Sequence, residues 1–256
     1  MILAGVFFVG LLAGFVDAIA GGGGLIMLPG LLVTGLPVGN AIASNKLCGT
    51  CGAIISSFKF AHARQVNWRI CQLMSIPIIA GSHLGSRSIG LLPSTWAEPL
   101  IIVLMIIITL FVLFKPNFGK DAPAVNAEAH STITPKQMIV GLFASGVIGF
   151  HDGFFGPGTG IFLVFVLLSL WSQGFLKATG STKVLNLLAN ATALATFAIA
   201  GNIDYSKGII GAIGVGIGSF IGATFATKKG AKIIKPLFIA VTVSLIVKLL
   251  IDYLLS

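Results

Sequence analysis

Charged side chains are scarce in this sequence, and their scarcity excludes most classes of soluble protein. Only 9% of the 256 residues are Asp, Glu, Lys or Arg, whereas 56% are hydrophobic and the mean hydropathy is +1.03. Soluble domains carry about 25% charged residues. The longest polar stretch, at 115–135, contains several prolines and predicts a linker rather than a soluble domain. We therefore expect a protein embedded in a lipid bilayer.

Cysteine and reactive polar groups are also few. The three cysteines, Cys48, Cys51 and Cys71, are too few for a disulfide framework, and no second ligand pair accompanies them to bind a metal. The sequence contains no P-loop, no metal-ligand set and no nucleophile beside a base. It therefore predicts a non-enzymatic protein without cofactor or metal. The net charge of +9 comes from basic residues scattered through short loops, which indicates orientation in a bilayer and not nucleic-acid binding.

Apolar runs of helical length, in contrast, fill most of the chain. Because a helix needs about 20 apolar residues to cross the hydrocarbon core, most of these runs predict spans. The second run is too short and contains Pro29, so we expect eight to ten true spans in an all-α polytopic fold. The ten predicted elements are at about 2–20, 22–35, 40–61, 68–91, 94–114, 136–155, 157–175, 178–200, 206–227 and 231–255.

The two halves of the chain repeat each other. The run 43–47 matches 180–184 with an offset of 137 residues, and the same offset aligns 66–68 with 203–205. A register that is kept along the chain predicts an internal repeat. We accordingly divide the chain into a first transmembrane repeat, a linker and a second transmembrane repeat, at residues 1–114, 115–135 and 136–256.

The basic residues indicate how the repeats are oriented. With five elements in each half, the second repeat is upside down, and eleven loop Lys and Arg fall on the side of the linker against three on the other side. An even number of spans in each half gives eight against six, which is no bias. Since cytoplasmic loops are rich in Lys and Arg, the pattern favours inverted repeats, a cytoplasmic linker and both termini outside.

Glycine-rich motifs interrupt both halves at matching places. Residues 14–25 read GFVDAIAGGGGL, and 149–160 read GFHDGFFGPGTG. Broken helices are tolerated in a membrane where the freed backbone is buried or lines a wet cavity. A helix that begins after such a break directs unpaired N–H groups and a positive dipole end at what lies before it. We expect broken or re-entrant helices that cradle an anion, whereas the alternative is that the glycines only allow close helix packing.

Charged residues accompany both motifs. Lys46 and Lys183 correspond across the repeat, and a lysine inside a membrane indicates function unless it reaches the headgroups. Asp17 and Asp152 also correspond, and each could pair with a lysine, hold the break together or take up a proton. These two are the candidate coupling or structural carboxylates. The predicted substrate-binding residues are Gly21, Gly22, Gly23, Gly24, Asn45, Lys46, Gly156, Gly158, Thr159, Thr182 and Lys183.

At these motifs the chain resembles the sulfite exporter TauE/SafE family of membrane permeases. GFVDAIAGGGGLIMLPGLL, NAIASNKL and QVNW are similar to the first half of that family, and GFHDGFFGPGTGIF, GSTKVLNLLANATAL and GNIDY to the second. The resemblance implies a multi-pass permease of the bacterial inner membrane for sulfur-containing anions. It also implies that Asn45, Lys46, Thr182 and Lys183 fall in the most characteristic motifs of the family.

The leading hypothesis is a secondary transporter that moves sulfite or an organosulfonate through a site between the repeats. One alternative is a passive anion channel of the same architecture, and another is a membrane enzyme or assembly subunit whose glycines merely pack helices. The predicted partners are a small anionic substrate and the lipid bilayer, without nucleic acid. A homo-oligomer, the transport direction and the coupling ion stay open.

Overall fold

The computed structural model describes residues 1–89, 133–171 and 173–229, and over these ranges the chain forms eight helices and no strand. The predicted all-α membrane fold is confirmed. The predicted elements at 94–114 and 231–255 lie outside the described residues. The helices are α1 Ile2–Ala20, α2 Gly24–Leu32, α3 Val38–His62, α4 Trp68–Ile89, α6 Pro135–Phe154, α7 Thr159–Trp171, α8 Phe175–Ile199 and α9 Tyr205–Lys229.

Helix length separates the elements into two kinds. Among the described helices, α1, α8 and α9 are long and apolar enough to cross a membrane. At 1.5 Å per residue, the nine residues of α2 extend only about 14 Å, too short for the hydrocarbon core. The 13 residues of α7 are likewise short. The chain therefore breaks after α1 and again after α6, at the two glycine-rich motifs.

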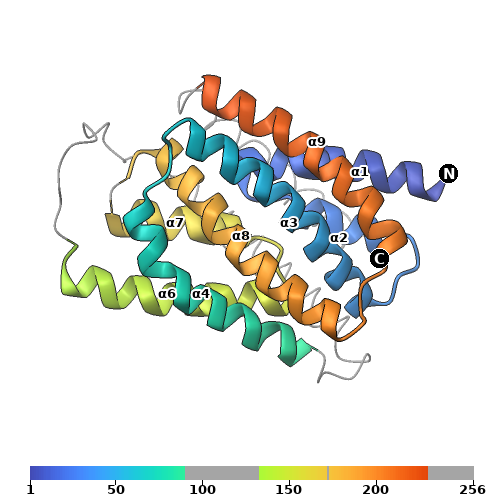
Figure 1. The fold of residues 1–256 in the computed structure, drawn as a ribbon, viewed down its shortest axis with the longest axis horizontal. Helices are drawn as coiled ribbons and strands as arrows, with labels where there is room; N and C mark the ends of the chain where they lie inside the picture. The colour runs from blue at the N-terminus through green and yellow to red at the C-terminus, as the bar shows by residue number, and fades with distance from the viewer. Residues whose placement is uncertain (90–132, 172, 230–256) are drawn as a thin grey trace, which may run out of the picture.

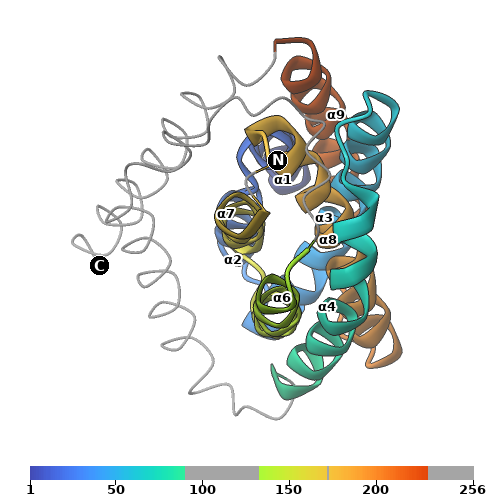
Figure 2. The ribbon, with the colours of Figure 1, turned by 90° about the vertical axis from the view of Figure 1, so that its left-hand side faces the viewer.

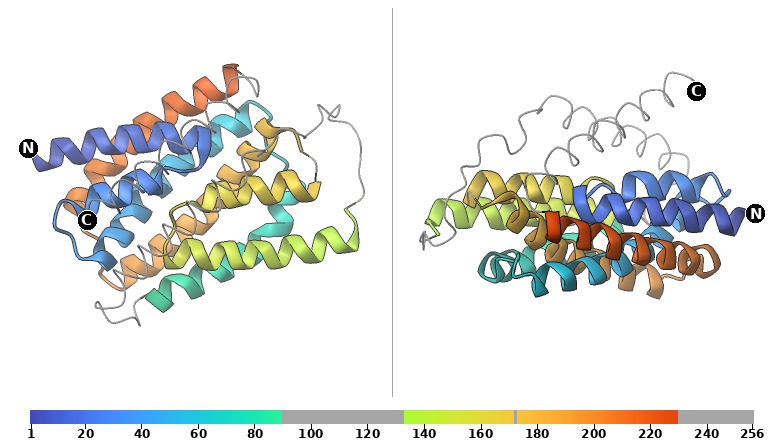
Figure 3. Two further views of the ribbon diagram at one scale, coloured as in Figure 1. Left: turned by 180° about the vertical axis from the view of Figure 1, so that it is seen from behind. Right: turned by 90° about the horizontal axis from the view of Figure 1, so that it is seen from above.

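The helices form two layers, which are seen best in Figures 2 and 3. One layer contains α1, α2, α6 and α7, and the other contains α3, α4, α8 and α9. Contacts between α1 and α9, and between α6 and α4, join the first half of the chain to the second. These two contacts correspond to each other under the repeat. Each half of the protein is thus completed by packing against the other.

Corresponding helices point in opposite directions. In Figure 1, α1 runs from the right to the left of the view whereas α6 runs from left to right. The pair α3 and α8 is related in the same way. This arrangement supports the predicted inversion. Since the fifth element of each half lies outside the described residues, two inverted repeats of five elements stay a prediction.

Close packing of α1 on α9 depends on glycine. A Cβ atom at Gly10 would lie 2.6 Å from the carbonyl oxygen of Gly211, and one at Gly222 would lie 2.6 Å from that of Phe15. Real side chains do not tolerate these distances, so the two backbones come as close as they do only because both helices are rich in glycine. At these positions the glycines serve to allow close helix packing, which is the alternative that the sequence left open for the glycine-rich motifs.

The start of α6 is fixed by local hydrogen bonds. The Thr134 hydroxyl accepts a bond from the Gln137 N–H at 3.2 Å, and the Gln137 side chain accepts one from the Thr134 N–H at 3.0 Å. This reciprocal pair is a capping box, and Pro135 occupies the first helical position, which favours proline. The helix therefore begins at Pro135, close to the start of the helical element predicted at about 136–155.

Candidate functional site

The two glycine-rich breaks meet each other in the middle of the protein. Gly21 ends α1 with a φ of 71°, and Gly156 and Gly158 adopt φ values of 99° and 86° between α6 and α7. Residues with a side chain rarely adopt these angles. A Cβ at Gly21 would lie 2.8 Å from the Cα of Gly160, so the two breaks touch backbone to backbone. Both glycine motifs thus contribute to the same region of the protein, where the two breaks are in contact.

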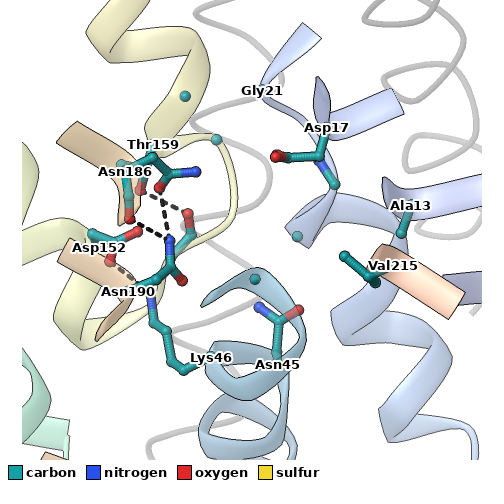
Figure 4. A pocket seen from close by; sticks show the side chains of 16 residues that line it. Ala13, Asp17, Gly21, Asn45, Lys46, Asp152, Thr159, Asn186, Asn190 and Val215 are labelled. Atoms are coloured by element: carbon teal, nitrogen blue, oxygen red, sulfur yellow. Dashed lines mark hydrogen bonds and ion pairs between the residues drawn. The ribbon is translucent and has the colours of Figure 1, made fainter. Parts of the chain in front are cut away.

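Beside this contact lies a small polar cavity with a volume of about 40 Å³ (Figure 4). One water needs about 10–15 Å³ by this measure, so there is space for about three or four waters. The walls come from both halves and both layers of the fold. The lining residues are Ala13, Asp17, Gly21, Gly23, Gly24, Asn45, Lys46, Gly49, Asp152, Gly156, Gly158, Thr159, Gly160, Asn186, Asn190 and Val215.

A buried ion pair forms one wall of the cavity. Lys46 on α3 donates from Nζ to Oδ2 of Asp152 on α6 at 2.8 Å, and each side chain is 1% exposed. A Cβ at Gly156 would lie 2.6 Å from this Nζ, so the glycine leaves the space that the ammonium occupies. Lys46 belongs to the first repeat and reaches the break of the second.

The second ion pair is the repeat counterpart of the first. Lys183 on α8 contacts Oδ2 of Asp17 on α1 at 3.0 Å and also donates to the backbone carbonyl of Asp17. Oδ1 of Asp17 accepts a bond from the Gly23 N–H at 3.2 Å. The carboxylate therefore caps the N-terminus of α2 and holds the first break together while it pairs with a lysine from the other repeat.

The ion pairs change the charge of the predicted site. Lys46 and Lys183 are 1% and 0% exposed, so neither side chain extends to the surface as a snorkelling lysine would. Each is paired with a carboxylate of the opposite half. The two lysines and two aspartates together have no formal net charge, whereas the two lysines alone suggested a positive site. Both Asp17 and Asp152 take the pairing role that the sequence left open.

Neutral hydrogen-bonding groups line the rest of the cavity. Asn45 lies on α3, and Asn186 and Asn190 lie one turn apart on α8. Nδ2 of Asn190 donates to the side-chain oxygen of Asn186 at 2.8 Å and to its backbone carbonyl at 2.9 Å. The hydroxyl of Thr159, at the start of α7, donates to the Gly156 carbonyl at 2.7 Å.

Most of the predicted site residues line this cavity, and three do not. Gly22, Thr182 and Lys183 are not part of its wall. Lys183 acts through Asp17, and the buried Thr182 hydroxyl has no hydrogen-bond partner within the described residues. The predicted residues in the wall are Asp17, Gly21, Gly23, Gly24, Asn45, Lys46, Asp152, Gly156, Gly158 and Thr159.

The wall also contains Asn186, which the sequence offers as a neutral hydrogen-bond donor, and Asn190, which the prediction missed. Thr182, Asn186 and Asn190 follow one another at intervals of four, which places them on one face of a helix. This spacing could have found Asn190. The repeat could not, because the counterpart of Asn190 in the first half is Ala53.

A second hollow lies apart from this site. It has a volume of about 840 Å³ between α4 and α8, and His83, Arg87 and Thr196 are among its lining residues. None of the predicted site residues lines it. The small cavity is therefore the place where the sequence motifs converge.

Fold and site together define an all-helical, multi-pass membrane protein with a buried polar cavity between its two halves. The chain belongs to the sulfite exporter TauE/SafE family, whose model matches residues 6–249. The resemblance drawn from the sequence motifs is thereby confirmed.

The similar curated proteins carry transporter names. The chain is 36% identical to a probable membrane transporter protein of Sinorhizobium, over 98% of this chain and 93% of the relative. It is 34% identical to a probable membrane transporter protein of Haemophilus influenzae, over 98% of this chain and 95% of the relative. It is 31% identical to the probable membrane transporter protein YfcA of Escherichia coli, over 98% and 91%. No solved structure matches the chain significantly.

Proposed function

We propose that the chain is a secondary transporter that moves a small sulfur-containing anion, such as sulfite or an organosulfonate, across the bacterial inner membrane. The observation that carries this proposal is the cavity, because both glycine breaks and side chains of both halves form its walls. Transporters with inverted repeats bind their substrates at such breaks, between the repeats. The family description and the names of the relatives support transport in place of catalysis.

The chemistry of the walls suits an oxyanion. The first turns of α2 and α7 begin at Gly24 and Thr159, and the positive dipole end of each helix favours negative charge. Several N–H groups of these turns already donate to carbonyls just before the helix, as Leu25 does to Gly22 and Ile161 does to Gly158. The ammonium of Lys46 and the amide of Asn45 add further donors. Space for about three or four waters is close to the size of an anion with four heavy atoms, such as sulfite.

The way in which the halves pack supports a transporter over a passive channel. Contacts of α1 with α9 and of α4 with α6 join the halves on both sides of the cavity. A change in how one half lies on the other would open the cavity first to one side and then to the other. In the proposed orientation, the linker faces the cytoplasm and both termini face outside.

Flux measurements in proteoliposomes test the proposal. Purified protein should show saturable counterflow of labelled sulfite, which unlabelled sulfite or methanesulfonate on the opposite side accelerates. Flux that never saturates and is not accelerated by substrate on the opposite side would favour the anion channel. Absence of flux for sulfite, methanesulfonate and sulfoacetate alike would overturn both.

A further inference from the structure

The charges around the cavity are balanced before any substrate binds. Lys46 is paired with Asp152, and Lys183 is paired with Asp17. An anion that enters this cavity adds an uncompensated negative charge in a place from which water is largely excluded. Burying an unpaired charge is strongly unfavourable in proteins. Binding therefore requires that a negative charge leaves the wall or that a positive charge joins it.

Asp152 is the group that competes most directly with a bound anion. Its carboxylate forms an ion pair with the ammonium of Lys46 at 2.8 Å, and both side chains belong to the cavity wall. A carboxylate and a substrate anion at one ammonium repel each other strongly in a medium of low dielectric. If Asp152 accepts a proton from the solution, Lys46 becomes available to the anion and the net charge of the loaded site is again zero.

We propose that the Lys46–Asp152 pair couples transport to protons, so that one proton on Asp152 accompanies each monovalent anion. This inference rests on the proposed function and names its coupling ion. The empty site holds a lysine ammonium and a carboxylate, and the loaded site holds the ammonium, a carboxylic acid and the anion. The empty site and the loaded site are both neutral. The protein can therefore switch the access of the site from one side of the membrane to the other equally well in either state.

Asp17 is less suited to this role, although it is the repeat counterpart of Asp152. Its carboxylate is held by the Gly23 N–H as well as by Lys183, and Lys183 also binds the backbone carbonyl of Asp17. Lys183 is not part of the cavity wall, so an anion in the cavity does not displace Asp17 from it. Asp17 therefore keeps its contacts with Lys183 and its position at the break.

Among the described residues, the titratable groups around Asp152 are His151, Lys46 and Asp17. His151 beside it on α6 contacts the Thr159 hydroxyl through Nδ1 at 3.4 Å. The groups of the packed elements nearest to the Asp152 side of the cavity are Lys46 from α3, Asp17 from α1, Thr159 from α7, Asn186 and Asn190 from α8, and Ser82 and Ser86 from α4.

Calorimetry of methanesulfonate binding to the full chain measures the coupling directly. The sulfonate group stays ionised between pH 6 and 8, so protons taken up on binding belong to the protein. Titrations in two buffers of different ionisation enthalpy should give an uptake of about one proton per bound anion. The dissociation constant should then rise by up to about tenfold for each pH unit, the linkage expected for one proton.

Substitutions identify the proton acceptor. Asp152→Asn imitates the protonated state, so it should bind methanesulfonate with proton uptake near zero and with an affinity independent of pH. The matched control is Asp204→Asn. Asp204 lies in the loop before α9, where the N–H of Lys207 holds the pKa of its carboxyl below its usual range, so it is already ionised at neutral pH. This control should keep the uptake of the native protein.

The outcomes separate the coupling from the proposed function. Methanesulfonate binding to the native protein without proton uptake would overturn the coupling and leave the transporter intact. Uptake that persists in a folded Asp152→Asn protein would assign the proton to another group and also overturn the proposal. If Asp152→Asn does not fold, the proton count of the native protein and its pH slope still decide. No binding of methanesulfonate, sulfite or sulfoacetate would overturn both proposals together.

Discussion

The hydroxyl of Ser44 on α3 accepts a hydrogen bond from the backbone N–H of Asp204, which precedes α9, at 3.0 Å. Its repeat counterpart is the hydroxyl of Ser181 on α8, which accepts one from the N–H of Asn67 before α4 at 2.9 Å. In each case a serine two residues before a paired lysine ties its helix to a loop of the opposite half. The two bonds therefore help to fix the positions of Lys46 and Lys183 along the direction of α3 and α8 relative to the cavity.

Removing either serine hydroxyl should destabilise the fold. Ser44→Ala and Ser181→Ala each leave a backbone N–H without its partner, which costs about 1–3 kcal/mol when the group is buried. Both variants should lower the thermal unfolding temperature of the protein in detergent. Ser75→Ala, at a half-buried serine whose hydroxyl bonds to the Gln72 carbonyl of its own helix, is the control and should leave this temperature unchanged. Equal unfolding temperatures in all three variants would show that the hydrogen bonds of Ser44 and Ser181 do not contribute to the stability of the fold.

The orientation of the repeats can be tested with two matched loops. His62, the last residue of α3, and Ala200, which follows α8, are both exposed and fall at nearly corresponding places in the two repeats. Inverted repeats place such positions on opposite sides of the membrane. In a background without native cysteine, Ala200→Cys should be labelled by an impermeant maleimide in intact cells, and His62→Cys only after the cells are permeabilised. Labelling of both positions from the same side would contradict the inversion.

Local sequence patterns predicted the helices well because apolar runs and breaks are local properties. The predicted element 2–20 agrees with α1 at both ends, and the glycine run after it ends the helix as expected. The element predicted at 22–35 is shorter in the structure. It ends at Leu32, and Gly35 beyond it adopts a φ of 80°.

The pairing of charges could not be predicted in the same way. The sequence placed two lysines and two aspartates near the breaks, yet Lys46 and Asp152 are 106 residues apart. Which lysine meets which carboxylate depends on how the halves cross, and local patterns do not contain that information. The structure shows that each lysine pairs with the carboxylate of the opposite repeat, so the four side chains together have no formal net charge.

The second glycine break should be sensitive to a single methyl group. Gly156→Ala introduces a Cβ 2.6 Å from Nζ of Lys46 at a backbone φ of 99°, so the substitution both strains the chain and displaces the ammonium. We expect sulfite counterflow to fall by at least tenfold per folded protein. Gly39→Ala is the control, because a Cβ there meets no atom within 4 Å. Full counterflow in Gly156→Ala would mean that the break is only a spacer.

Substitution of Lys46 should weaken anion binding as well as the fold, because it also leaves the buried Asp152 carboxylate without its cation. Glutamine keeps much of the length and the hydrogen-bonding capacity of lysine but removes its charge. A hydrogen bond to a charged group contributes about 1.5–3 kcal/mol, so affinity for methanesulfonate should fall roughly ten- to a hundredfold. Lys46→Arg keeps the charge in a different geometry and should restore only part of this loss. Lys207→Gln, at a half-buried position near the start of α9 and outside the cavity wall, is the control and should bind as the native protein does.

Substitutions of Lys46 and Lys183 should differ in how much anion affinity they remove, although the two lysines correspond in the repeat. Lys183 lies outside the cavity wall and holds Asp17, which in turn caps α2. Lys183→Gln should therefore lower the unfolding temperature and the yield of folded protein, because it leaves the partly buried Asp17 carboxylate without its cation. The protein that does fold should lose less affinity than Lys46→Gln. Calorimetry normalised to folded protein makes the comparison, and equal loss of affinity in both variants would place Lys183 in direct contact with the anion.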